Sequence, residues 1–269
     1  MKTIRILLSM LLAIVSVLYG ITFFSDRLGD QNTPPSLSCS AATLELSVAD
    51  GEDVLLSGLS ASDEQDGDLT AAIRIAGISK FIRENTAKIT YVVFDRDGNV
   101  ATASRYLHYT DYVSPRFSIT APLNYKRNSS INLLERLKAS DGIDGDITDA
   151  IRVSALTSTP DPETYTVEVQ VTNSMGDTSR LTIPVIQTDG FGQRPEIALR
   201  SYLVYLDRGS SFDARSYLLQ VSLPQGTGEL QDVKIVGTVD TATPGTYMVR
   251  YTYTHEGTSG YSILTVVVE

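Results

Sequence analysis

Two acidic segments hold the residues of this sequence that are best suited to chemistry. "ASDEQDGDLTAAIR" begins at Ala61, and "ASDGIDGDITDAIR" begins at Ala139. Each contains three aspartates within six residues, and these six side chains are Asp63, Asp66, Asp68, Asp141, Asp144 and Asp146. Calcium favours such oxygen-rich loops, and a glycine between two aspartates lets the chain bend around an ion. One interpretation is therefore a Ca²⁺ site in each segment.

The other interpretation is a structural turn. An EF-hand loop would continue to a bidentate glutamate at its twelfth position, but the twelfth residues counted from Asp63 and Asp141 are Arg74 and Arg152. Aspartate side chains accept hydrogen bonds from nearby backbone N–H groups, and Asp-Gly is a strong turn former. The segment would then occur twice because the fold occurs twice. The sequence leaves both interpretations open.

Other residue types argue against catalysis. The two histidines, His108 and His255, lie far apart, and the single cysteine, Cys39, can form neither a zinc cluster nor an intramolecular disulfide. No nucleophile motif such as G-x-S-x-G is present. We therefore expect a protein that is not an enzyme, with no cofactor other than the candidate calcium.

The overall negative charge restricts the classes of molecule that this protein is expected to bind. The formal net charge of −10 and the pI near 4.7 disfavour nucleic acid, because phosphate contacts need a basic surface. We expect a protein or a cell-wall glycan as partner. The candidate partner-binding residues are Tyr202, Tyr205 and Tyr217, which crowd one part of the chain. Alternatively, these rings pack inside a domain with their hydroxyls at its rim.

An internal repeat supplies the elements that position these residues. Pro35, Pro115 and Pro195 are spaced eighty positions apart, and each is followed by a strand-like stretch. Each repeat ends in two strands with alternating apolar residues joined by a turn, as in "GTYMVRYTYT" followed by "YSILTVVV". We predict an all-β fold of three tandem immunoglobulin-like β-sandwiches. Their predicted bounds are 35–112 (copy 1), 113–191 (copy 2) and 192–269 (copy 3).

These motifs resemble those of tandem bacterial Ig-like surface domains, a group similar to the hyalin-repeat and crystal-toxin Ig-like modules. That group carries "D-x-x-D-G-D-[LI]-T" and a later "G-T-Y-x-V-x-Y" strand. Copies 1 and 2 keep the acidic phrase, whereas copy 3 has "PQGTGELQD" in its place and keeps "PGTYMVRY". The resemblance spans about 35–269 and implies an exported module with an adhesive or mechanical role.

The N-terminus predicts a membrane anchor. Lys2 and Arg5 precede an apolar run over 6–24, and nineteen residues at about 1.5 Å each span roughly 28 Å, close to the bilayer core. Positive charge before this run orients 1–5 to the cytoplasm, and 25–34 form a tether. We expect a single-pass cell-membrane protein whose outer domains form an adhesion or binding stalk. The alternatives are a docking subunit of an envelope assembly and a wall-polysaccharide-binding protein.

Overall fold

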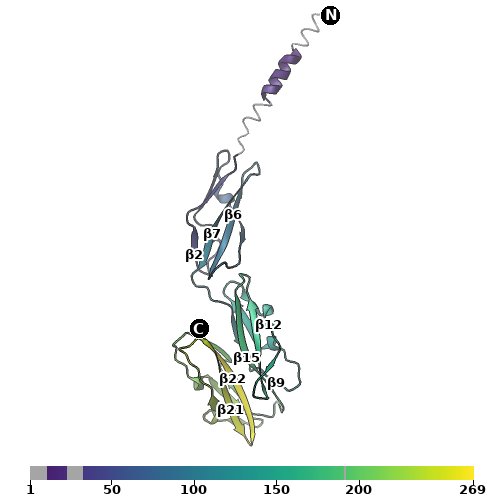
Figure 1. Cartoon of the computed structure of the whole chain (residues 1–269), viewed down its shortest axis with the longest axis vertical. Helices are drawn as coiled ribbons and strands as arrows, with labels where there is room; N and C mark the ends of the chain where they lie inside the picture. Colours follow the sequence, from purple (N-terminus) through teal and green to yellow (C-terminus); the bar gives the residue numbers. More distant parts are fainter. Residues whose placement is uncertain (1–10, 23–32, 191) are drawn as a thin grey trace. The chain divides into compact units, whose positions relative to one another are not determined.

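The computed structural model describes residues 11–22, 33–190 and 192–269. Residues 11–22 are helical (Figure 1). Within the described ranges, no helix is both long and apolar enough to cross a membrane. The remainder of the predicted span, at 6–10 and 23–24, lies outside the described residues, as do the cytoplasmic segment 1–5 and the tether up to residue 32. The transmembrane anchor therefore stays a prediction.

The rest of the described chain is mostly β and divides into two compact units, which meet in the sequence between His108 and Tyr109. Copy 1 forms two small sheets. The first has the strand order β1 (Ser36–Cys39), β3 (Leu59–Asp63), β4 (Gly67–Asp68). The second has the order β2 (Thr43–Leu46), β7 (Val100–Tyr109), β6 (Thr86–Phe94), β5 (Arg74–Ile78).

Copies 2 and 3, which together make up the second unit, repeat this plan. In copy 2 the first sheet has the order β11 (Gly145–Asp146), β10 (Leu137–Asp141), β8 (Arg116–Ile119). The second sheet of copy 2 has the order β12 (Arg152–Val153), β14 (Thr164–Thr172), β15 (Thr178–Thr188), β9 (Asn124–Lys126), and β13 (Thr157–Ser158) also pairs with β14. In copy 3 the first sheet has the order β16 (Glu196–Leu199), β18 (Leu218–Ser222), β19 (Thr227–Gly228). The second sheet of copy 3 has the order β17 (Leu203–Leu206), β22 (Thr258–Val268), β21 (Gly245–His255), β20 (Lys234–Val236).

Short helical turns connect the strands. They are α2 (Glu52–Leu55) and the 3-10 turns η1 (Thr70–Ala72), η2 (Leu133–Glu135), η3 (Thr148–Ala150), η4 (Ala214–Tyr217) and η5 (Leu230–Asp232).

The strand pairing explains why each copy closes into a sandwich. The last two strands of each copy form a long antiparallel hairpin, as in β14–β15 and β21–β22. The first strand lies in one sheet, and the second strand joins the other sheet by pairing in parallel with the last strand, as β9 does with β15 and β17 with β22. The N-terminal segment of each copy is thus shared between its two sheets.

The burial of the closing strand differs between the two units. In β7 of copy 1, exposed residues alternate with covered ones, as expected for a sheet with one face in water. In β15, the four successive residues from Ile183 to Ile186 are all buried, and in β22 the three from Gly260 to Ser262 are buried as well. Strands that lose their alternation are covered on both faces. The second unit accordingly has one continuous cluster of buried apolar side chains that draws on both copies.

Candidate functional site at the junction of copies 2 and 3

The first and third aspartates of each acidic phrase fold the loop onto itself. One carboxylate oxygen of Asp63, and of Asp141, accepts hydrogen bonds from the backbone N–H groups two and three residues later, over 2.8–3.0 Å. Asp68 and Asp146 each accept from the backbone N–H of the threonine two residues later, at 2.9 Å. The hydroxyl and backbone N–H of that threonine hold the pKa of both carboxyls below the usual range.

The middle aspartate ties the phrase to the turn of the closing hairpin. Asp66 accepts from the backbone N–H of Arg96 at 2.7 Å and lies 3.4 Å from its Nε. Asp144 accepts from both the backbone N–H and the hydroxyl of Ser174, each at 2.6 Å. In both copies the phrase therefore joins two loops at the end of the sandwich where the chain enters.

In copy 2 the same cluster also holds the incoming linker. The hydroxyl of Tyr112 lies 2.9 Å from Asp177 and 3.3 Å from the second oxygen of Asp141, and it accepts from Asn173 Nδ2 at 2.8 Å. Burial and these two carboxylates raise the pKa of Tyr112 well above its ordinary value. Among the residues that the structure describes, the corresponding second oxygen of Asp63 in copy 1 is buried without a hydrogen-bond partner.

The first and third aspartates of each phrase thus accept hydrogen bonds within local turns, and the middle aspartate accepts them from the closing hairpin. Over the described residues, no three His, Cys, Asp or Glu side chains are placed to hold one metal ion. Local turns account for the contacts of Asp63, Asp68, Asp141 and Asp146, and the calcium site stays a prediction.

The tyrosines predicted to bind a partner are engaged within the second unit. Tyr202 is buried and its hydroxyl accepts from the backbone N–H of Leu199 at 3.3 Å. The hydroxyl of Tyr205 accepts from the backbone N–H of Phe117 in copy 2 at 3.0 Å, and the Arg116 guanidinium lies 4.9 Å from the Tyr205 ring centre. Tyr217 stacks on Phe212 within copy 3, with ring centres 5.7 Å apart. Tyr205 therefore contacts the neighbouring copy, and partner binding by these tyrosines stays a prediction.

The apolar part of the junction lies between β15 and β22, which run side by side (Figure 1). The inner-facing residues of β22 pair with the buried face of β21, so its alternate residues Ile263 and Thr265 point out of the copy 3 sandwich. Ile263 and Thr265 share a small cavity with residues of copy 2, including Pro184 and Ile186 of β15. The face of copy 3 that would otherwise meet water is therefore covered by copy 2.

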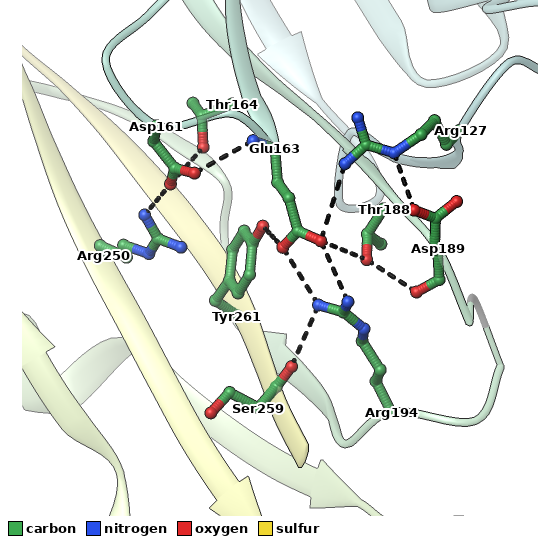
Figure 2. A network of polar contacts seen from close by, with 10 residues as sticks. All are labelled: Arg127, Asp161, Glu163, Thr164, Thr188, Asp189, Arg194, Arg250, Ser259 and Tyr261. Atoms are coloured by element: carbon green, nitrogen blue, oxygen red, sulfur yellow. Dashed lines mark hydrogen bonds and ion pairs between the residues drawn. The ribbon is translucent and has the colours of Figure 1, made fainter. Parts of the chain in front are cut away.

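A polar network borders this apolar contact, and Glu163 is at its centre (Figure 2). Glu163 precedes β14 in copy 2, and its two oxygens accept a bidentate pair of hydrogen bonds from Arg194 at 3.0 and 3.1 Å. The same carboxylate accepts from the hydroxyls of Thr188, at 3.2 Å, and of Tyr261 on β22. Arg127 lies 3.9 Å away. Glu163 thus binds copy 2, the linker before Pro195 and copy 3.

A second carboxylate, Asp161, extends the network across the same boundary. It pairs with Arg250 on β21 and accepts hydrogen bonds from the Glu163 backbone N–H and the Thr164 hydroxyl, both at 3.0 Å (Figure 2). The guanidinium carbon of Arg250 lies 3.9 Å from the centre of the Tyr261 ring. Two carboxylates of copy 2 are therefore matched by two arginines and a tyrosine from the linker and copy 3.

The hydrogen bonds that Asp161 and Glu163 accept determine whether these two carboxyl groups are ionised. Burial alone would raise the pKa of Asp161, but the Glu163 N–H, Arg250 and Thr164 outweigh it and bring the pKa below its ordinary value. The pKa of Glu163 is lowered in the same way, because the bonds from Tyr261, Arg194 and Thr188 outweigh burial. Both carboxylates are charged at neutral pH, and the junction keeps a balance of charges.

Sequence reasoning did not find Glu163, Arg194 or Arg250, because nothing in the local pattern says which charges meet. A signal was nevertheless present in "LTIPVIQ" of β15 and "SILTVVV" of β22. These near-continuous apolar runs break the alternation of a strand with one wet face, and they indicate coverage on both faces.

Replacing Glu163 with Gln should loosen the junction. The amide keeps the shape of the side chain but loses the charge that accepts from Arg194 and Tyr261, and a hydrogen bond to a charged group contributes about 1.5–3 kcal/mol. We expect the second unit of the full chain to unfold at a lower temperature, with the transitions of copies 2 and 3 drawn apart. Glu168→Gln, an exposed change on β14, is the matched control. Equal melting of the two variants would contradict this role of Glu163.

The junction should weaken in acid. Because the folded-state pKa values of Asp161 and Glu163 lie below their ordinary values of 3.8 and 4.5, their stabilisation is complete above pH 4.5 and is lost as pH falls below 3.8. Thermal unfolding of the full chain between pH 3 and 7 measures the effect, and the Asp161→Asn, Glu163→Gln double variant isolates it. The double variant should lose less stability on acidification than the wild type; the same loss in both would refute the assignment.

The two acidic phrases should respond differently to the same change. Asp141→Asn places an amide where one carboxylate oxygen accepts from Asn173 at 3.1 Å, so we expect a loss of about 1–3 kcal/mol. Asp63→Asn replaces an oxygen that has no hydrogen-bond partner in the described part of the chain, so the cost in copy 1 should be much smaller. Chemical denaturation of the two variants gives the comparison, and a larger loss for Asp63→Asn would overturn it.

Comparisons with known proteins give only distant likenesses. No protein-family model and no curated protein matches the chain. A structure of catalytic and carbohydrate-binding-module domains of Clostridium perfringens ZmpB matches at 12% identity and a TM-score of 0.25, covering 87% of this chain and 30% of that one. The Protocadherin GammaB4 extracellular domain matches at 14% and 0.22, covering 88% and 49%. A lipoprotein from Bacteroides thetaiotaomicron matches at 12% and 0.22, covering 86% and 98%. The chain thus spans less than half the length of the first two, and scores this low carry no argument about function.

Proposed function

We propose that this chain is a non-catalytic, membrane-anchored bacterial surface protein in which copies 2 and 3 form one binding head. The observation that carries the proposal is the junction, where Glu163 binds Arg194 of the linker and Tyr261 of copy 3. In chain order, copy 1 separates this head from the predicted anchor. The structure of the junction supports a binding head made of copies 2 and 3 together, rather than three copies that act independently.

A fused pair of modules suits recognition for a physical reason. Tandem domains joined by a short linker ordinarily move relative to each other, because their shared interfaces are small and polar. A junction with both an apolar cluster and a charge-balanced border removes that freedom before any ligand arrives. Binding across the pair then costs less ordering entropy, which is the general advantage of preorganisation.

The chemistry of the junction also supports a non-catalytic role. A general base needs a carboxylate that is free to reach a substrate proton. Glu163 is instead held by Arg194, Tyr261 and Thr188, and Asp161 is held by Arg250 and Thr164. These groups are arranged to fix two modules together.

A wall-polysaccharide-binding protein is the second candidate function. It is favoured by an open polar cleft beside the junction, lined by two arginines and several hydroxyl groups. The other alternative is a docking subunit of an envelope assembly. In that case, a pull-down of this protein from solubilised membranes would recover a partner protein in a fixed ratio.

The anchor is tested by charge in the apolar run. Leu12 and Val15 lie in the helical segment 11–22, and an arginine near the middle of a spanning helix costs about 2.5–3.5 kcal/mol. We expect the Leu12→Arg, Val15→Arg variant to leave the membrane fraction of bacterial cells, while Leu12→Val, Val15→Leu stays there and exposes a C-terminal tag to an impermeant label on intact cells. A tag that is labelled only after lysis would contradict the surface location.

A further inference from the structure

An open cleft of about 590 Å³ lies beside the polar network of the junction. Arg194 and Glu163 line it from the linker and copy 2, and the β21–β22 hairpin supplies the rest, including Arg250, Thr252 and Thr258. Its volume falls in the range of about 300–1,000 Å³ that small-ligand sites occupy. The cleft exists only when copy 3 is docked on copy 2, because its walls come from both.

Arg250 keeps most of its hydrogen-bonding capacity for this cleft. A guanidinium carries five N–H donors, and the hydrogen bond of Arg250 to a described residue runs from Nη1 to Asp161. Stacking on the Tyr261 ring, at 3.9 Å, fixes the plane of the guanidinium (Figure 2). About a third of the Arg250 side chain is exposed, at 35%. The cleft therefore contains the planar guanidinium of Arg250 in a fixed orientation. One of its N–H donors is paired with Asp161, and its other donors are available to a ligand.

The lining indicates the chemical class of the ligand. Sites for apolar ligands are lined mainly by hydrophobic side chains. This cleft is instead lined by arginine, threonine, serine, glycine and glutamate, together with a buried tyrosine. A planar arginine fork matches a carboxylate in bidentate geometry, and threonine hydroxyls both donate to and accept from sugar hydroxyls. A ligand rich in hydroxyls and carrying carboxylates satisfies all of these groups.

We propose that this cleft binds an acidic oligosaccharide, with a sugar carboxylate on Arg250 and sugar hydroxyls on Thr252 and Thr258. This rests on the proposed function of copies 2 and 3 as a single binding head. Because the cleft is lined by Glu163 of copy 2 as well as by Arg250 of copy 3, a ligand that fills it favours the docked state and raises the unfolding temperature of the second unit. The net charge of −10 repels a polyanion at long range, so binding is not weakened by moderate salt as a purely electrostatic contact would be.

The experiment is calorimetric titration of the full-length protein in detergent with an oligosaccharide of galacturonic acid, and with the same oligosaccharide as its methyl ester. We expect the acid to bind and the ester not to bind. Arg250→Gln should weaken binding roughly tenfold or more, and Arg250→Lys should also weaken it, because lysine keeps the charge but not the fork. Arg208→Gln, an exposed change in copy 3 outside the lining of the cleft, should retain binding.

Two results would overturn the proposal: no binding of the acid to the wild type, or equal affinity of the wild type and Arg250→Gln. If Arg250→Gln unfolds the junction, Thr252→Val tests the same contact, because it removes a hydroxyl on a strand that tolerates a β-branched residue. Thr252→Val should weaken binding severalfold, and unchanged affinity would count against the cleft. The titration does not depend on the anchor, so failure here is distinguishable from a wrong surface location.

Discussion

The pairing of Glu163 with donors from three different parts of the chain is the interaction on which the second unit depends. A carboxylate that is mostly removed from water is tolerated only when its hydrogen bonds are met. Arg194 from the linker, Tyr261 from copy 3 and Thr188 from copy 2 meet them together. Undocking copy 3 would remove two of these three at once. The polar network around Glu163 therefore fixes how β15 and β22 are aligned where they form the apolar contact.

The acidic phrases and the junction are two solutions to one problem, which is how a sandwich holds the segment that enters it. In copy 2, Asp141 and the hairpin turn hold Tyr112 of the incoming linker. In copy 3 the phrase is replaced by "PQGTGELQD", and Arg194 of the incoming linker is held by Glu163 of the preceding copy. The segment that enters copy 3 is thus held by a carboxylate of the neighbouring copy rather than by an acidic phrase of its own.

The repeat, the strands and the turn alternative for Asp63 and Asp141 could all be predicted from the sequence, because each depends on local chemistry and spacing. The mostly β fold of several small sheets is confirmed, whereas the anchor and the surface role remain proposals. The partners of Glu163 and Asp161 could not be predicted, because Arg194 and Tyr261, which bind Glu163, and Arg250, which binds Asp161, lie 31 to 98 residues away. The sequence also did not predict that the Tyr205 hydroxyl accepts a hydrogen bond from copy 2, and partner binding by Tyr202, Tyr205 and Tyr217 stays a prediction.

The measurement that tests the central claim most directly is native-state hydrogen exchange of the full chain at increasing denaturant. Residues that open together share one dependence of exchange free energy on denaturant. If copies 2 and 3 form one cooperative unit, the amides of β14–β15 and of β21–β22 will converge on a single line, and those of β6–β7 will follow another. Separate lines for β14–β15 and β21–β22, with copy 3 opening at lower denaturant while copy 2 stays closed, would contradict the account.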